Sequence, residues 1–255
     1  MPIIDTHAHI DQIENWSEAV KRAQEAQVSD IVAVSVDLDS MQKVLGLAKA
    51  TTKIKIHPAL GVHPGMVKEG VSQASYDFIR THIKEAIAVG ETGLDYWYKW
   101  VRDNQEERAK QKDSFNIHLQ IAKEFDLPII IHSRGAFKDC LALTKDSGVK
   151  RALFHWYSGP VDILKSIMEA GFYVSTSPSV AHSPQSQEAM LAADLDRILI
   201  ETDSPVTYKD GDTSFVSEPK DVIRTLKALS KLKNVDEAKL LNIVNQNAKS
   251  FFRIK

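Results

Sequence analysis

Residues 30–37 read DIVAVSVD, a continuous apolar segment rich in valine that ends on an aspartate. Strands of a parallel sheet are buried on both faces, so they show unbroken apolar runs instead of polar–apolar alternation. Residues 197–203, RILIETD, repeat the pattern, with an isoleucine–leucine run followed by acidic residues. These two stretches predict buried parallel strands with polar side chains at their carboxyl ends.

The same kind of segment occurs eight times along the chain. The expected strands are Ile3–Ile4, Ile31–Val36, Ile54–Val62, Ala86–Gly90, Pro128–Ile131, Ala152–Phe154, Phe172–Val174 and Ile198–Ile200. Helical patterns lie between them, clearest at Ser114–Phe125, Glu218–Leu229 and Asp236–Phe252, where apolar residues recur every three or four positions. Strands that alternate with helices eight times predict a (β/α)8 TIM barrel in the α/β class.

The spacing of the residues that follow the strands supports this architecture. From His9 to Asp203 the seven steps average roughly 28 residues, near the about 31 per unit of a 250-residue barrel. A doubly wound open sheet is the competing fold. It gives no reason for eight units, and no glycine-rich phosphate fingerprint follows the first strand.

Composition limits the class of protein. The 255 residues are 43% hydrophobic and 26% charged, which is typical of one globular domain spanning residues 1–255. The net charge of −2 gives no general attraction for nucleic acid, so a phosphate-binding surface has to be local. A single cysteine, Cys140, favours a reducing, cytoplasmic setting. No apolar run reaches the ~20 residues of a membrane span, and nothing indicates an obligate protein partner.

Histidines and carboxylates gather at the predicted strand ends. His7 and His9 form an H-x-H pair whose side chains share one face, because the period of a strand is two. The other candidates are Glu91, His132, His155 and Asp203. A lone strand-end histidine is usually a cap or a loop anchor. Four imidazoles and two carboxylates at one barrel mouth instead predict a divalent-metal site, for Zn, Mn, Co or Mg.

The sequence resembles the TatD family of metal-dependent deoxyribonucleases, within the amidohydrolase-like barrels. The resemblance rests on DTHAHID, GVHPG, VGETGLDY, LPIIIHSR, FHWYSG, ILIETDSP and NQNAKSFF, in this order along nearly the whole chain. Related phosphotriesterase-type barrels carry a bridging lysine, whereas the matching strand end here carries Glu91.

The resemblance implies two metal ions. By this likeness His7, His9, Glu91 and Asp203 hold one ion, and Glu91, His132 and His155 hold the second, with Glu91 bridging. His63 in GVHPG matches a family residue near the substrate phosphate. The expected catalytic residues are therefore Asp203, which accepts a proton from water, Glu91, and His63, which donates to the phosphate or the leaving oxygen.

Two segments of the sequence depart from the family pattern. Trp156 and Tyr157 stand in HWYSG where the family usually has cysteine and phenylalanine. Gly135 follows Arg134 where an acidic residue is common, which predicts an altered loop after the fifth strand.

Substrate contacts are expected from the rim of the barrel. Arg134 offers a fork of donors for a phosphate, with a surface ion pair as the alternative. The segment from Tyr96 to Arg102 interleaves aromatic rings with Lys99. Its Trp97 and Trp100 either stack on unpaired bases or pin the loop to the barrel.

The expected function is hydrolysis of DNA phosphodiester bonds with two divalent ions, because such ions orient and activate water. The resemblance adds DNA as the substrate and 3'-5' exonucleolytic action, and stacking of unpaired bases on the rim predicts a preference for single strands. One alternative is an amidohydrolase or esterase, such as an aminoacyl-tRNA deacylase. Another is a metal-binding scaffold without catalysis, which the intact set of candidate ligands disfavours.

Overall fold

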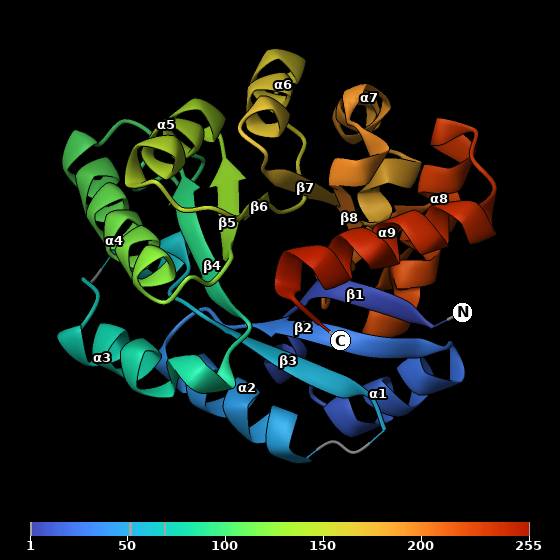
Figure 1. Cartoon of the computed structure of the whole chain (residues 1–255), viewed down its shortest axis with the longest axis horizontal. Coiled ribbons are helices and arrows are strands. Elements are labelled where there is room, and N and C mark those ends of the chain that lie inside the picture. The colour runs from blue at the N-terminus through green and yellow to red at the C-terminus, as the bar shows by residue number, and fades with distance from the viewer. Residues whose placement is uncertain (1, 51–52, 69, 255) are drawn as a thin grey trace.

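A computed structural model describes residues 2–50, 53–68 and 70–254. Within this part of the chain, eight parallel strands lie side by side in sequence order. Helices surround them on the outside (Figure 1). The predicted (β/α)8 barrel is confirmed, because each outer helix returns the chain to the same end of the sheet for the next parallel strand.

The elements follow one another as strand and helix. The barrel strands are β1 (Ile3–Ala8), β2 (Val28–Val34), β3 (Lys55–Leu60), β4 (Ala88–Asp95), β5 (Ile129–Arg134), β6 (Ala152–Phe154), β7 (Tyr173–Thr176) and β8 (Ile198–Ile200). The α-helices are α1 (Trp16–Glu25), α2 (Leu38–Ala50), α3 (Gln73–His82), α4 (Gln105–Glu124), α5 (Phe137–Ser147), α6 (Val161–Glu169), α7 (Pro184–Ala192), α8 (Val222–Lys233) and α9 (Glu237–Phe252). Short 3-10 turns are η1 (Ile10–Gln12), η2 (Pro64–Met66), η3 (Ile83–Glu85), η4 (Pro178–Ala181), η5 (Leu195–Arg197) and η6 (Pro219–Asp221).

The sheet closes where β1 meets the segment that follows β8. The backbone N–H of Asp203 donates to the carbonyl of His7 at 2.9 Å, and the N–H of His9 donates to the carbonyl of Ser204 at 2.7 Å. Three candidate site residues are therefore brought together by the hydrogen bonds that complete the barrel.

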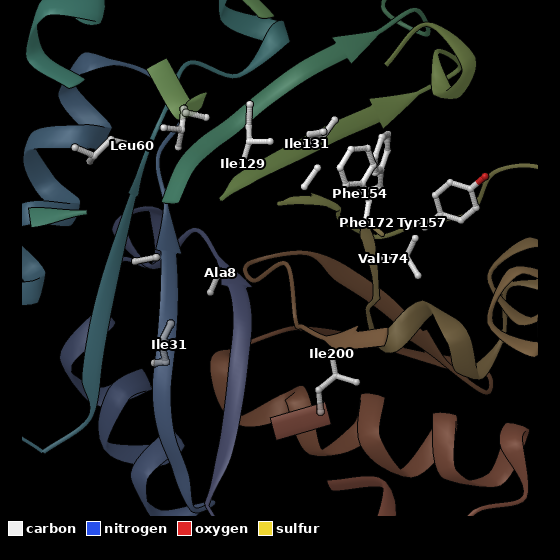
Figure 2. Close-up of a cluster of buried hydrophobic side chains, with 14 of the residues drawn as sticks. Ala8, Ile31, Leu60, Ile129, Ile131, Phe154, Tyr157, Phe172, Val174 and Ile200 are labelled. Carbon is white, nitrogen blue, oxygen red and sulfur yellow. The ribbon is translucent and has the colours of Figure 1, made fainter. Parts of the chain in front are cut away.

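Two apolar layers form because successive strand residues point to opposite faces of the sheet. Ile129 and Ile131 of β5 belong to the layer that packs against the helices, part of which is drawn in Figure 2. Ile130 belongs to a smaller inner cluster with residues from the other strands, and Phe251 and Phe252 of α9 pack against it. The start of β7 contacts Phe251, so apolar side chains fill the barrel at the amino ends of the strands and leave the opposite mouth to polar groups.

Several strands extend further than expected toward this mouth. Glu91 and His132 were predicted to follow their strands, but they lie within β4 and β5. β1 also runs past the predicted Ile3–Ile4 to Ala8, so His7 lies on the first strand as expected, whereas His9 lies just beyond it at the start of η1. The sequence underestimated these strands because their polar ends interrupt the apolar runs, while the backbone ladder continues through residues that face the mouth.

The helices differ from expectation at their ends, and α8 runs past the predicted Leu229 to Lys233. The predicted helix Ser114–Phe125 is the second half of α4, which begins at Gln105 after Asn104 has accepted hydrogen bonds from two first-turn amides. The predicted Glu218–Leu229 helix divides into η6 and α8. The helix expected at Asp236–Phe252 is α9, with Asp236 as its N-cap.

An antiparallel hairpin after β8 was not predicted. Its strands are β9 (Thr207–Asp210) and β10 (Thr213–Val216), and they turn at Gly211. In the described ranges, no helix combines the length and the apolar character needed to cross a bilayer.

Candidate metal centre and catalytic cavity

Four donor atoms from three parts of the barrel form a first cluster. Nε2 of His7 lies 3.3 Å from Oε2 of Glu91 and 3.2 Å from Oδ1 of Asp203. Nε2 of His9 lies 3.2 and 3.4 Å from the same two oxygens. Ligands that share one zinc ion at about 2.0–2.2 Å lie roughly 3.3 Å from one another. The spacing of the four atoms fits one divalent ion.

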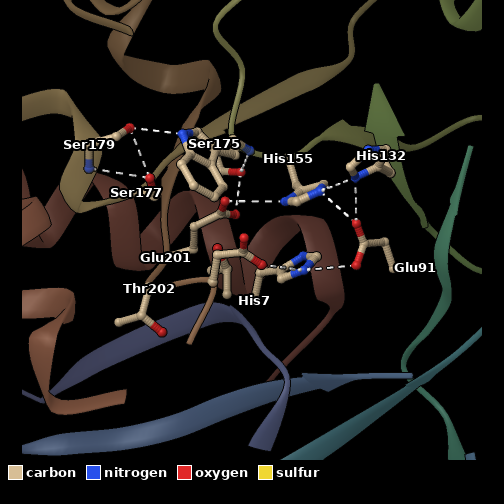
Figure 3. A network of polar contacts seen from close by, with 12 residues as sticks. His7, Glu91, His132, His155, Ser175, Ser177, Ser179, Glu201 and Thr202 are labelled. Carbon is tan, nitrogen blue, oxygen red and sulfur yellow. Dashed lines mark hydrogen bonds and ion pairs between the residues drawn. The ribbon is translucent and has the colours of Figure 1, made fainter. Parts of the chain in front are cut away.

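A second cluster uses the other oxygen of Glu91. Its Oε1 lies 2.9 Å from Nδ1 of His132 and 2.8 Å from Nε2 of His155, and these nitrogens are 3.4 Å apart. Figure 3 shows one oxygen of the Glu91 carboxylate connected to His7 and the other oxygen connected to His132 and His155. The two oxygens of one carboxylate thus face two separate groups of nitrogens, which is the arrangement of a bridging ligand.

Buried polar atoms without hydrogen-bond partners support a cation at the first cluster. Nε2 of His7, Oε2 of Glu91 and Oδ1 of Asp203 are buried, and none of them has a hydrogen-bond partner among the described residues. Buried polar atoms are normally satisfied, because an unmet group costs about 1–3 kcal/mol or more. These unmet atoms all face one point, so the residues present fit a metal ion.

Carboxylates behind the imidazoles fix the orientation of their rings. Nε2 of His132 donates to Oδ2 of the buried Asp95 at 3.1 Å, which leaves the lone pair of Nδ1 toward Glu91. Nδ1 of His155 lies 3.3 Å from Oε1 of Glu201, which leaves Nε2 toward Glu91. Such outer carboxylates hold metal-binding histidines in one tautomer.

The charges of the cluster favour a cation. Burial opposes a charge on His9, but the carboxylates of Asp203 and Glu91 raise its pKa to about 10. Burial likewise opposes a charge on His155, yet Glu91 and then Glu201 raise its pKa well above the usual value. The carboxyl of Glu91 is buried, but the surrounding imidazoles hold its pKa well below the ordinary range. Sites that stabilise imidazolium by negative potential also attract metal ions.

His63 stands beside the second cluster with a different role. Its Nδ1 accepts a hydrogen bond from the backbone N–H of Gly65 at 2.9 Å, so the proton of the neutral ring is on Nε2. That Nε2 lies 3.7 Å from Oε1 of Glu91. Burial lowers the pKa of His63 to about 3. The ring therefore anchors the turn after β3 and, as a neutral imidazole, offers an N–H donor to the cavity.

The clusters open into a cavity of about 750 Å³. Its lining includes His9, His63, Glu91, His132, His155 and Asp203 of the predicted site, together with Trp97 and Arg134. His7 lies below, fully buried. Trp100 is not among the described residues that line the cavity. It stacks on Tyr98 with ring centroids 5.7 Å apart, which is the arrangement expected of a residue that pins the loop.

Arg134 forms an ion pair and also lines the cavity. Its Nε and Nη2 lie 2.8 and 2.7 Å from Oδ2 of Asp95, so it is an ion pair. The partner is buried inside the barrel instead of on the surface, and the guanidinium still lines the cavity. Burial opposes a charge on Asp95, but its hydrogen bonds to His132 and Arg134 lower its pKa to about 2.

Three buried acids of this region were missed by sequence reasoning. Asp5 accepts hydrogen bonds from the backbone and hydroxyl of Thr202 and ties β1 to the segment before Asp203. Asp95 and Glu201 hold His132 and His155. A signal was available, because each acid lies an even number of positions from a candidate ligand on the same strand or strand end.

Comparison with known proteins identifies the family. The model of the family described as "TatD related DNase" matches residues 4–253. The chain belongs to this family. A "Putative deoxyribonuclease tatdn3" of Danio rerio is 30% identical, with 98% of this chain and 96% of that protein covered. An "Uncharacterized metal-dependent hydrolase MJ1582" of Methanocaldococcus jannaschii shows the same identity and coverage.

Solved structures agree with the fold. The TatD homologue YJJV of Escherichia coli superposes with a TM-score of 0.90 at 23% identity, covering 99% of this chain and 98% of that one. The resemblance seen in the sequence is thus confirmed, and so is the expected enzyme class, a TatD-type metal-dependent hydrolase.

One of the two bulky residues in HWYSG of this TatD chain shapes the cavity. Trp156 lines it, and its Nε1 donates to Oγ of Ser179 at 2.8 Å while its ring packs near Tyr208 of β9. Tyr157 is buried, and its hydroxyl donates to the carbonyl of Pro160. The substitution relative to the family pattern therefore changes one cavity wall through Trp156.

Proposed function

We propose that this chain is a deoxyribonuclease that hydrolyses DNA phosphodiester bonds with two divalent ions. The observation that carries the proposal is the division of Glu91 between two groups of imidazoles, at 3.3 and 3.2 Å through Oε2 and at 2.9 and 2.8 Å through Oε1. Bound ions at these positions would supply positive charge for the phosphate and a nucleophilic water. Residues His7, His9 and Asp203 would hold one ion, and His132 and His155 the other.

The protein's own groups can accept the proton of the attacking water and donate hydrogen bonds to the phosphate or the leaving oxygen. Oδ1 of Asp203 faces both imidazoles of the H-x-H pair, and Oδ2 takes no part in these contacts. We assign proton acceptance from the attacking water to Oδ2. His63 carries its proton on Nε2 and donates a hydrogen bond to the phosphate or to the leaving oxygen. Arg134, held by Asp95, contributes a fixed positive charge beside the phosphate.

The cavity favours a strand end over an intact duplex. A volume of about 750 Å³ is that of a pocket for a small molecule or a few linked groups. Trp97, 61% exposed, presents a ring at the cavity on which an unpaired base can stack. We therefore propose exonucleolytic cleavage that prefers single strands, in the 3'-5' direction that the family resemblance implies. We further propose that residues 1–255 act as one unit in the cytoplasm.

A matrix of metals and substrates tests this function. The purified protein, stripped and reloaded with Mg, Mn, Zn or Co, is offered single-stranded and duplex DNA labelled at either end, RNA and aminoacyl-tRNA. Shortening of single-stranded DNA from its 3' end, faster than of blunt duplex, is the expected result. Turnover of aminoacyl-tRNA alone would replace the nuclease by a deacylase, and stoichiometric metal without any turnover would leave a metal-binding scaffold.

A further inference from the structure

Gly135 lies directly after β5 in a left-handed conformation, with φ of 68°. A Cβ atom at this position would lie 2.5 Å from Cδ1 and 2.7 Å from Nε1 of Trp97. Both distances are far below van der Waals contact. The pyrrole edge of the Trp97 indole therefore occupies the space that any side chain at position 135 needs.

The buried carboxylate of Asp95 binds both the main chain of Trp97 and the guanidinium beside its ring. The backbone N–H of Trp97 donates to Oδ1 of Asp95 at 2.9 Å. Oδ2 of Asp95 binds Arg134, whose guanidinium carbon lies 5.7 Å from the centroid of the indole. Asp95 itself is 0% exposed, so it is a fixed anchor. The main chain of Trp97 and the guanidinium beside its ring are thus held in place from one side.

The ring nevertheless remains largely open to solvent. Trp97 is 61% exposed and lines the cavity, whereas a tryptophan without a binding role is usually mostly buried. A ring that is already held along one edge loses little freedom when a ligand stacks on it. The guanidinium next to it suits the phosphate attached to a stacked base.

We propose that Gly135 is a positioning residue that sets the substrate specificity of this mouth. Gly135 has no side chain, so the Trp97 ring can lie over it. Trp97 and Arg134 then form a preformed platform for an unpaired nucleobase and its adjoining phosphate. The nucleobase as ligand rests on the proposed nuclease function, whereas the dependence of the ring on Gly135 does not.

An added methyl group at this position displaces the ring and not the backbone. The carbonyl of Arg134, before Gly135, accepts a hydrogen bond from the N–H of Tyr96 at 2.9 Å, and the carbonyl of Ala136, after it, accepts from the N–H of Cys140 at 2.9 Å. The main chain on both sides of Gly135 is therefore paired, whereas the indole is bounded by Gly135 along one edge and is otherwise 61% exposed, so the ring is the part that gives way. Gly135→Ala is expected to reproduce the binding defect of Trp97→Ala.

The chain offers a matched control for the strain of a left-handed alanine. Gly148, which follows the other end of α5, has φ of 74°, and among the residues that the structure describes a Cβ there would meet the side chain of Lys123 alone, at 3.5 Å. Gly148→Ala carries the same backbone penalty without any contact with Trp97. Differences between the two alanine variants therefore report on the ring.

The test measures affinity for two oligomers that differ only in their bases. One is a cleavage-resistant phosphorothioate oligothymidylate, and the other is the same backbone without bases, each added to the metal-loaded protein. Gly135→Ala and Trp97→Ala should each weaken oligothymidylate binding roughly 5- to 150-fold, the range of one lost stack. Both should leave the abasic oligomer unaffected, and so should Gly148→Ala. The double variant should bind no more weakly than Trp97→Ala alone.

Several results would overturn the proposal. These are unchanged oligothymidylate affinity in Gly135→Ala, additive losses in the double variant, or equal losses for the abasic oligomer. A second measurement works even if the wild type binds neither oligomer and the nuclease function fails. Acrylamide quenching of tryptophan fluorescence should change in Gly135→Ala relative to the wild type, but not when Trp97 is already alanine. If Gly135→Ala quenches identically to the wild type, as the double variant is expected to do relative to Trp97→Ala, this result alone refutes the positioning role.

Discussion

Replacing Glu91 with glutamine keeps the length of the side chain and removes one carboxylate oxygen and its charge. In the structure each oxygen faces two imidazole nitrogens, with contacts of 3.3 and 3.2 Å on one side and 2.9 and 2.8 Å on the other. The amide nitrogen of glutamine has no lone pair for a metal. Whichever way the amide turns, one group of imidazoles loses its shared ligand, and the other keeps only a neutral oxygen.

The expected loss of metal affinity can be compared with that for a carboxylate that contacts a metal-binding histidine and not the metal. Carboxylates that only orient a metal-binding histidine contribute about 10- to 100-fold in metal affinity when removed. Glu201 is such a residue, because it contacts the outer nitrogen of His155 at 3.3 Å. Glu91 faces both clusters directly, so Glu91→Gln should lose more than about 100-fold at one site, or over ~2.7 kcal/mol, and weaken the second as well.

Calorimetric titration of metal-stripped protein, with metal counted after gel filtration, measures both quantities. The wild type is expected to bind up to two ions, Glu201→Gln to weaken one of them about 10- to 100-fold, and Glu91→Gln to weaken both. Turnover should fall in the same order. Circular dichroism confirms that each variant is folded, so that a loss of metal is not a loss of structure.

Two ions bound by Glu91→Gln with wild-type affinity would refute the bridging assignment. A loss restricted to one ion, with the other unchanged, would show that the carboxylate serves a single site. If Glu201→Gln weakened both ions as much as Glu91→Gln does, the ranking by contact distance would be wrong.

Three further predictions concern pH, the aromatic loop and metal removal. His118 is buried on α4, and burial lowers its pKa to about 4, so its stabilising effect is complete above about pH 6.5 and is lost as the pH falls toward 4, by up to ~3 kcal/mol. Urea unfolding should show a smaller acid loss for His118→Gln, and equal losses would contradict this. Trp100→Ala should lower stability by about 1 kcal/mol and slow turnover on base-bearing and abasic oligomers in parallel, because the ring stacks on Tyr98; a selective loss on the base-bearing oligomer would show that it stacks on bases. Chelation by EDTA should abolish activity and lower the thermal midpoint, since an ion at 100-fold over its Kd adds about 3 kcal/mol of stability, and an unchanged midpoint would argue against a structural contribution of the ions.

Local sequence signals were sufficient for the strands and for the residues that converge at the mouth. Apolar runs such as Ile198–Ile200 indicate burial on both faces, and polar residues after them lie at one end because all the strands are parallel. The sequence alone therefore predicted that His9, Glu91 and Asp203 lie together at the mouth of the barrel. The ends of the strands were missed, because apolar pattern stops where the lining of the mouth becomes polar, although the backbone pairing continues.

The sequence by itself determined the barrel, the family and the convergence of four imidazoles with two carboxylates, because periodicity and motif order are local properties of the chain. Only the tertiary structure decided which atoms face one another. In the structure the two oxygens of Glu91 face different clusters of imidazoles. Asp95 binds both His132 and Arg134. Trp97 is exposed, whereas Trp100 stacks on a neighbouring ring. These relations depend on contacts between strands and loops distant in sequence, and on side-chain directions that no local pattern encodes.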